Sequence, residues 1–215
     1  MNNRYTLLIL YVLFLCLPSQ SLADTGLPRY EIDKNHSFIS VYTDKAGLLK
    51  RLGHRHIISI RDIEGQVLFH TVKDSSAKLR FSPNDFVIDD PAERTKAGKG
   101  FSSEVSDKDA AGTRRNMLSK KLLDSESYPH IKVDISLLSL KEQQAEFLAT
   151  IDIKGQTFTY KIPGELKMSG NKLNVTAEFV LNHGGIGLKP FSAAAGAVKV
   201  AKTLHFKVSL QANRI

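Results

Sequence analysis

The chain has 215 residues, a formal net charge of +8 and a single cysteine. A chain of this length is expected to form one domain, because barrels and sandwiches of this size commonly stand alone. The densest basic group, Arg114-Arg115 and Lys120-Lys121, has no interleaved aromatic residues. This pattern disfavours nucleic-acid binding and favours a solvated face or a loose attraction to anionic lipid headgroups.

The first residues have the pattern of a cleaved secretory signal. Arg4 gives a positive start, residues 6–17 are almost all apolar, and Ser21 and Ala23 are small residues before a cleavage site. The apolar run is shorter than the roughly twenty residues that span a bilayer. We expect residues 1–23 to be removed on export, which leaves a domain at 24–215. That domain has no cysteine, because Cys16 lies in the signal.

From Tyr30 onward, apolar residues recur mainly at every second position, the period of strands with one buried and one exposed face. The pattern is clearest in the second half, where it predicts strands at residues 131–137, 145–153, 158–162, 173–181 and 198–210. In the first half it predicts strands at residues 37–43, 56–63, 66–72 and 78–81.

The connections between the later strands are short and carry turn residues. Lys154-Gly155 and Ser169-Gly170-Asn171 supply the glycine or asparagine that tight hairpins need, so neighbouring strands are expected to be antiparallel. A sheet of about eight such strands tends to close, because closure removes the exposed edges. The sequence therefore predicts an all-β protein with a minor helix, built as a closed antiparallel barrel.

One segment breaks the strand period. Asp89 and Asp90 precede Pro91 in a predicted loop, where solvation accounts for the acidic pair. The sequence then predicts one main helix over residues 106–123, capped by Ser106 and packed against the barrel or across its mouth. A shorter helical turn is predicted at residues 46–52.

The inward-facing positions mix large and small side chains. A barrel of eight strands is either filled by its own side chains or able to hold one slender ligand, and periodicity alone leaves both interpretations open. If a cavity is present, its walls and its ligand are apolar. The candidate lumen residues are Phe147, Ala149, Phe158, Tyr160, Phe179 and Phe206.

Several local sequences together resemble the YceI-like family of exported polyisoprenoid-binding proteins. They lie in order from about Tyr30 to about Ala212 and include Tyr30-Glu31-Ile32-Asp33 with His36-Ser37, Ile63-Glu64-Gly65-Gln66-Val67, Met117-Leu118-Ser119, Leu122-Leu123-Asp124, Tyr128-Pro129-His130-Ile131 and Gly184-Gly185-Ile186-Gly187. The resemblance implies a lipocalin-like barrel with an accompanying helix and a periplasmic location. It also implies a lipid ligand with a long isoprenoid tail, as in a quinone, and no catalytic residues.

The chain departs from the family pattern at Leu52-Gly53-His54-Arg55-His56, which is similar to a subgroup with a Gly-His-x-His sequence. In an extended segment, His54 and His56 share one face with Ile58 and Ile60. The same parity places His183 on the face of Phe179 and Leu181. The three histidines could therefore meet at one mouth of the barrel.

Three uses of these histidines remain open: lining the mouth, contacting a ligand headgroup, or binding zinc or copper. His54, His56 and His183 fall short of a specific metal spacing, so no metal and no other cofactor is assigned. No Gly-x-Ser-x-Gly elbow or other nucleophile signature is present in the sequence. We expect a carrier of an isoprenoid-type lipid that contacts a membrane or membrane protein transiently. A histidine-dependent metal or redox protein is the alternative, and an enzyme on the same barrel is a weaker one.

Overall fold

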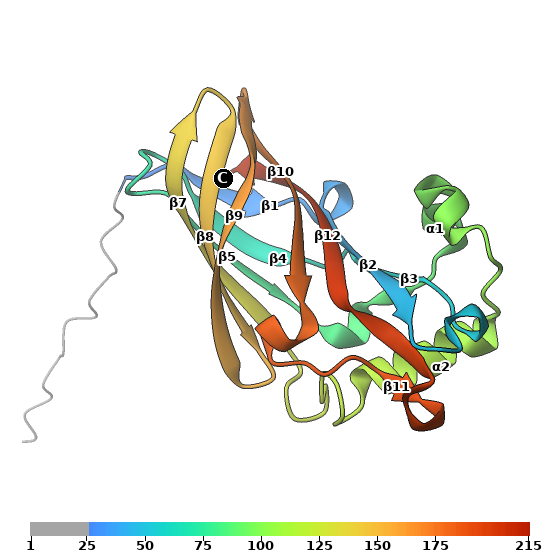
Figure 1. The fold of residues 1–215 in the computed structure, drawn as a ribbon. Helices are drawn as coiled ribbons and strands as arrows, with labels where there is room; N and C mark the ends of the chain where they lie inside the picture. Colours follow the sequence, from blue (N-terminus) through green and yellow to red (C-terminus); the bar gives the residue numbers. More distant parts are fainter. Residues whose placement is uncertain (1–25) are drawn as a thin grey trace, which may run out of the picture.

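The computed structural model describes residues 26–215 and folds them around an antiparallel sheet that closes into a barrel (Figure 1). The predicted signal peptide, residues 1–23, lies outside the described residues. Eight strands form the ring, and the pairing of β1 with β12 closes it, which confirms the predicted barrel. In ring order these strands are β1 (Arg29–Ile32), β4 (Glu64–Leu68), β5 (Ser76–Phe81), β7 (Ile131–Lys141), β8 (Gln144–Ile153), β9 (Gln156–Ser169), β10 (Lys172–Asn182) and β12 (Val198–Arg214).

Three more strands extend the sheet along the first part of β12, and together they are termed the flap: β2 (Phe38–Ala46), β3 (His56–Ile60) and β6 (Val87–Ile88). A short strand, β11 (Ser192–Ala193), pairs with the start of β12. One edge of β12 pairs with β10. The other edge pairs with β2 over Lys199–Ser209 and with β1 near the C-terminal end of β12. The sheet is therefore closed at one end, while at the other end the flap diverges toward the helices (Figure 1).

Two α-helices are present among the described residues, α1 (Pro91–Ala97) and α2 (Asp107–Leu118). The predicted main helix is confirmed as α2, and Ser106 caps it by accepting a hydrogen bond from the amide of Asp109 at 3.2 Å. The sequence did not predict α1, which Asp90 caps in the same way. No helix within residues 26–215 has the length and apolar character to cross a bilayer. Short 3₁₀ turns are η1 (Lys34–His36), η2 (Lys50–Leu52), η3 (Pro83–Asp85), η4 (Lys99–Phe101), η5 (His183–Ile186) and η6 (Ala194–Gly196).

The later strands follow the predicted meander because their turns carry the required residues. Lys154 and Gly155 join β8 to β9 with φ values of 51° and 69°, a turn in which both central residues are left-handed. Gly170 turns β9 into β10 with φ of 58°. These two hairpins fix the register in which Phe147 and Ala149 face inward, so the alternation in the sequence becomes the inner wall of the barrel.

Candidate functional site

The centre of the barrel is a cavity of about 660 Å³ and is not filled by its own side chains. Its walls are mostly aliphatic and aromatic side chains from the ring strands and the flap, with α2 closing one side through Met117. Of the two interpretations that the sequence left open, the structure therefore favours the one with internal space. The small residues Ala149 and Ala177 are both buried in the wall, where larger side chains would reduce this space.

Four of the six candidate lumen residues line this cavity: Phe147, Ala149, Phe179 and Phe206. Phe179 on β10 and Phe206 on β12 are direct cross-strand partners. Their rings are stacked, with centroids 5.0 Å apart and an interplanar angle of 2°. Both rings therefore face the cavity as one stacked pair.

The other two candidates, Phe158 and Tyr160, are on the expected face of β9 but are not among the residues that line the cavity. The turn η5 covers them. The Tyr160 hydroxyl donates a hydrogen bond to the carbonyl of Gly185, and a Cβ on Gly187 would lie 2.8 Å from Cζ of Phe158. Strand parity placed both rings on the correct side, but it did not show that a later turn packs over them.

His54 and His56 enter the cavity from the start of β3, as the parity argument predicts. The ring centroids of the two histidines are 6.3 Å apart. Nδ1 of His56 donates to Oδ2 of Asp89 at 2.6 Å, because an ionised carboxylate can only accept. Nε2 of His56 has no hydrogen-bond partner within residues 26–215, and in the neutral ring it is an acceptor.

Asp89 was expected to be solvated in a loop, and this prediction is wrong. Its side chain is fully buried beneath α1, because the pairing of β6 with β3 carries it to the start of β3. Oδ1 of Asp89 accepts from the amide of Ile57 at 2.9 Å and from the guanidinium of Arg94 at 2.6 Å. Burial alone would raise the pKa of Asp89, but the hydrogen bond from His56 and the other donors outweigh it and hold that pKa below its usual value.

Arg94 anchors this arrangement from α1. Besides Asp89, its guanidinium donates to the carbonyls of Arg55, Phe101 and Ser103 at 2.7–2.9 Å. It also lies 5.7 Å from the centre of the Phe101 ring. Arg94 is itself buried, and its hydrogen bonds connect the start of β3 with α1 and η4. No sequence signal marked Asp89 or Arg94, because their roles depend on the contact of α1 with β3.

His183 is the first residue of η5 and also lines the cavity. Its Nδ1 donates to the carbonyl of Lys202 at 3.0 Å, and burial lowers the pKa of the ring despite that hydrogen bond. The neutral ring of His183 therefore presents Nε2 as an acceptor. All three candidate histidines line the same cavity, but no group of three His, Cys, Asp or Glu residues in the described part of the chain is arranged to hold a metal.

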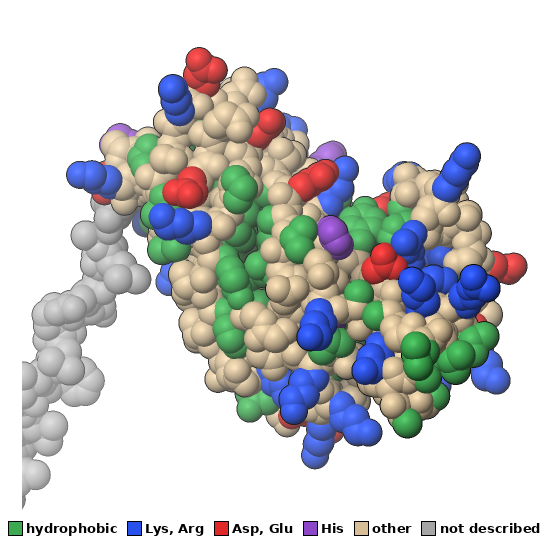
Figure 2. Space-filling model, viewed as in Figure 1, with side chains coloured by type: hydrophobic (Ala, Val, Ile, Leu, Met, Phe, Trp, Pro, Cys, Tyr) green, Lys and Arg blue, Asp and Glu red, His purple; other side chains and the backbone are tan. Residues whose placement is uncertain are grey.

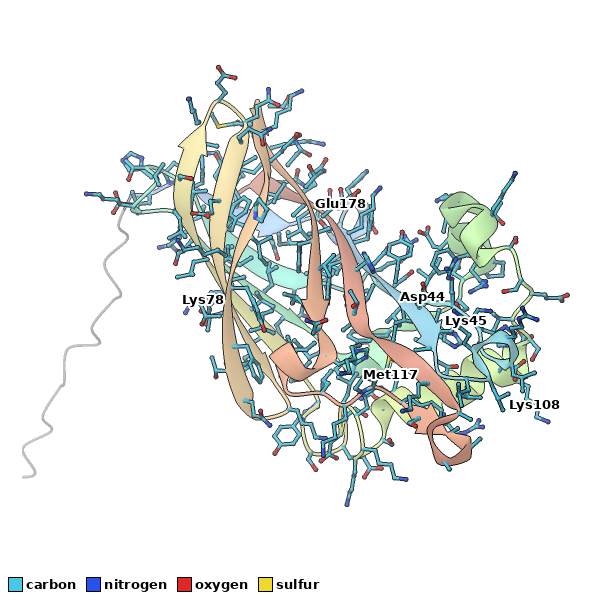
Figure 3. All side chains as sticks on the ribbon, in the orientation of Figure 1. Asp44, Lys45, Lys78, Lys108, Met117 and Glu178 are labelled. Atoms are coloured by element: carbon cyan, nitrogen blue, oxygen red, sulfur yellow. The ribbon has the colours of Figure 1, made fainter. Side chains whose placement is uncertain are left out.

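One opening of the cavity is basic, a feature that the sequence did not predict. Four cationic residues line the cavity there and are termed the basic mouth: Lys45, Lys108, Arg115 and Lys199. They outnumber the one exposed carboxylate in the lining, Asp109. Lys108, Arg115 and Lys199 are also exposed to solvent, which marks this place as an opening. Figure 3 shows Lys45 on β2 and Lys108 on α2 at the same end of the molecule, while Met117 lies further along α2.

The profile of the YceI-like domain matches residues 30–212 of the chain. The chain belongs to the YceI-like family. The match covers the whole barrel of this YceI-like domain, from β1 to β12, and confirms the family resemblance seen in the sequence. The finer resemblance to a Gly-His-x-His subgroup stays a prediction that rests on Gly53, His54 and His56.

Solved structures share the fold of this YceI-like domain. BcnA of Burkholderia cenocepacia is 13% identical with a TM-score of 0.59, and the match covers 84% of this chain and 98% of BcnA. The YceI protein of Campylobacter jejuni is 7% identical with a TM-score of 0.51, with 73% and 83% covered. No curated protein sequence matches the chain. At these identities the likeness establishes a common barrel and leaves the ligand to be argued from the site.

Proposed function

We propose that this YceI-like domain is an exported, periplasmic carrier that holds one isoprenoid or similar long apolar lipid in the barrel lumen. The cavity of about 660 Å³ with aliphatic and aromatic walls is the observation that carries this proposal. Ligand sites commonly measure about 300–1,000 Å³. Burying an apolar chain gains about 25 cal/mol for each Å² removed from water, so a long tail supplies most of the binding free energy.

The polar end of the lipid belongs at the end of the cavity where the histidines and the basic mouth lie. Nε2 of His56 and Nε2 of His183 both belong to cavity-lining rings, so a headgroup hydroxyl can hydrogen-bond to either. The ammonium groups of Lys45 and Lys199 are available to headgroup oxygens. A lipid with a long apolar tail and a hydroxylated or quinol-type head, oriented with its tail toward the closed end, fits this arrangement.

Loading and release require transient contact with a membrane or a membrane protein, because a free isoprenoid chain is insoluble in water. We assign the domain to binding rather than catalysis. The described residues contain two hydrogen-bonded histidine–carboxylate pairs, His36 with Asp33 and His56 with Asp89, and neither has a nucleophilic side chain hydrogen-bonded to it.

Organic extraction of freshly purified protein followed by mass spectrometry tests the proposal. We expect about one lipid per barrel. The variant Ala149→Phe places a ring in the cavity and should lower the amount of bound lipid, because the ring occupies space that the ligand needs. The control is Leu148→Phe, which adds the same ring to the opposite face of β8 and should leave the lipid content unchanged.

Protein that carries no extractable lipid after gentle purification, and takes up none from isoprenoid-containing vesicles, would contradict the carrier. Metal content is measured in the same samples. Stoichiometric zinc or copper that disappears in a His54→Ala/His56→Ala variant, in protein without lipid, would replace the carrier by the metal-dependent alternative.

A further inference from the structure

The loop between β2 and β3 exposes three leucine side chains. Leu48 is 96% exposed, Leu52 is 72% exposed and Leu49 is 46% exposed. Residues 48–52 are termed the leucine loop. Single exposed leucines are ordinary on a protein surface, but three within five residues form a contiguous apolar patch, and such patches mark contact sites.

The backbone of this loop is held in place, so the leucines do not owe their exposure to a loose segment. The amide of Leu49 donates to the carbonyl of Ala197 at 2.8 Å, and Nζ of Lys45 donates to the carbonyl of Gly53 at 3.1 Å. Gly47 has φ of +92°, and a Cβ there would lie 2.3 Å from the Ala197 oxygen, so only glycine allows this approach. The leucines therefore project outward from a fixed support.

The leucine loop borders the cavity. Gly53 and His54, which follow it, and Lys45, which precedes it, all line the cavity. Phe191 and Val198 line the cavity on the neighbouring β12 side, and Phe191 is 42% exposed. The exposed leucines therefore lie beside the cavity opening, where a lipid tail would enter.

Positive charge surrounds this apolar patch. Lys50 and Arg51 lie within the loop and are exposed, and the basic mouth is adjacent. The nearby carboxylate of Asp44 is paired with Arg55 through hydrogen bonds of 2.9 and 3.1 Å. Figure 2 shows hydrophobic side chains beside Lys and Arg at the lower right of the molecule, the end where Figure 3 labels Lys45 and Lys108. Apolar side chains flanked by cations suit an interface between acyl chains and anionic headgroups.

We propose that the leucine loop and the basic mouth dock the open end of the barrel onto the surface of an anionic lipid bilayer. The leucines enter the headgroup region, the cations contact lipid phosphates, and the cavity opening then faces the bilayer. This inference deepens the carrier proposal, because it supplies the route by which a lipid passes between membrane and lumen. Docking itself does not require a ligand in the cavity.

Flotation of residues 24–215 with vesicles tests the docking. We expect binding to vesicles of phosphatidylcholine mixed with phosphatidylglycerol, weaker binding to phosphatidylcholine alone, and partial loss of binding in high salt. A Leu48→Ser/Leu52→Ser variant should bind anionic vesicles at least about tenfold more weakly, because two leucine side chains no longer enter the bilayer. A Met168→Ser/Val180→Ser variant is the control, since those residues are 59% and 52% exposed on β9 and β10.

A charge-reversal pair separates the electrostatic contribution. Lys50→Glu/Arg51→Glu should lower binding to anionic vesicles by about tenfold or more and have little effect with phosphatidylcholine alone. The matched control is Lys120→Glu/Lys121→Glu, an exposed basic pair whose following residues, Leu122 and Leu123, are partly or fully buried. This control should retain most of the binding, because its charges have no exposed leucines beside them.

Docking is overturned if the wild-type domain does not bind anionic vesicles, or if the leucine variant and its control bind equally well. It is also overturned if sedimentation shows a wild-type dimer that the leucine variant loses, because a second copy would then occupy the patch. Lipid extraction from the leucine variant is measured in parallel. If the leucine variant retains its lipid but no longer binds vesicles, the result supports docking. A wild-type protein without lipid counts against the carrier proposal, and the docking proposal then depends on vesicle binding by the wild type and its variants.

Discussion

The imidazole of His56 and the carboxylate of Asp89 are joined by a hydrogen bond of 2.6 Å, although they are 33 positions apart in the sequence. The same carboxylate receives the guanidinium of Arg94 and the amide of Ile57. One buried anion thus holds a cavity-lining ring on β3 and a cation on α1. Because each partner is satisfied only in the presence of the other, the stability of the flap and the orientation of the histidine depend on one residue.

The first prediction concerns this anion. Replacing Asp89 by Asn removes the charge and leaves the buried guanidinium of Arg94 without a counter-ion, which costs about 3–5 kcal/mol of unfolding free energy. Urea denaturation followed by circular dichroism measures the loss. The neighbouring change Asp90→Asn is the control, because asparagine caps a helix about as well as aspartate does, and it should cost less than about 0.5 kcal/mol. Equal losses in the two variants would contradict the prediction.

The second prediction is a pH dependence from His183. Burial holds the pKa of His183 in the fold below its usual value near 6.5, so only the unfolded chain takes up a proton as the pH falls through that value. The unfolding free energy should be highest above about pH 6.5 and decline below it by at most about 1.4 kcal/mol per pH unit.

A His183→Asn variant should show a flatter dependence between about pH 7.5 and 5, because asparagine keeps a donor for the carbonyl of Lys202 but does not titrate. Asp33, Asp44, Glu64 and Asp89 all have lowered pKa values and titrate below this range. Denaturation curves at a series of pH values measure the unfolding free energy of both proteins. If that free energy changes with pH equally in the variant and the wild type, His183 is not the cause.

The third prediction concerns the rings under η5. Tyr160→Phe removes the hydroxyl that donates to the carbonyl of Gly185 and should cost about 1 kcal/mol. Hydrogen exchange of the amides in η5 should quicken, because the turn loses its tether to β9. Tyr128→Phe serves as the control, since that hydroxyl has no hydrogen bond within the described residues and the change should leave both measurements unaltered. If hydrogen exchange in η5 is unchanged in Tyr160→Phe, the hydrogen bond from Tyr160 to Gly185 does not stabilise the turn.

The fourth prediction separates headgroup from tail. His56→Phe keeps an aromatic ring at the mouth but removes the polar Nε2 atom, so binding of a polyprenol should weaken about three- to tenfold. Binding of a hydrocarbon with the same chain should be unaffected. Competition with a fluorescent lipid measures both affinities, and His205→Phe on the exposed face of β12 is the control. If His56→Phe weakens both ligands equally, the ring contributes packing alone.

Much of the barrel followed from local pattern. The alternation from β7 to β12 and the turn at Lys154-Gly155 act between neighbours in the sequence, so periodicity and turn chemistry were enough to predict the meander. The parity of β3 also placed His54 and His56 correctly in the cavity wall. Each of these predictions needed only the direction of successive side chains along one strand.

The features that were missed depend on contacts between distant segments. Helix α1 has only seven residues, too few for a helical period to show. Asp89 is buried because β6 pairs with β3, and no local pattern reports that pairing. Phe158 and Tyr160 leave the cavity lining because η5 folds over them. In each case the outcome depended on contacts between distant segments, which a local sequence pattern does not report.

Between Val200 and Leu204, the pairing of β12 with β2 slips, and the pairing with β10 begins only at Thr203. Lys202 therefore has no partner in either ladder among the described strands, and its carbonyl is left to accept Nδ1–H of His183. That bond selects the tautomer whose lone pair is on the other ring nitrogen. A two-residue irregularity in the longest strand thereby fixes a hydrogen-bond acceptor inside an otherwise apolar cavity.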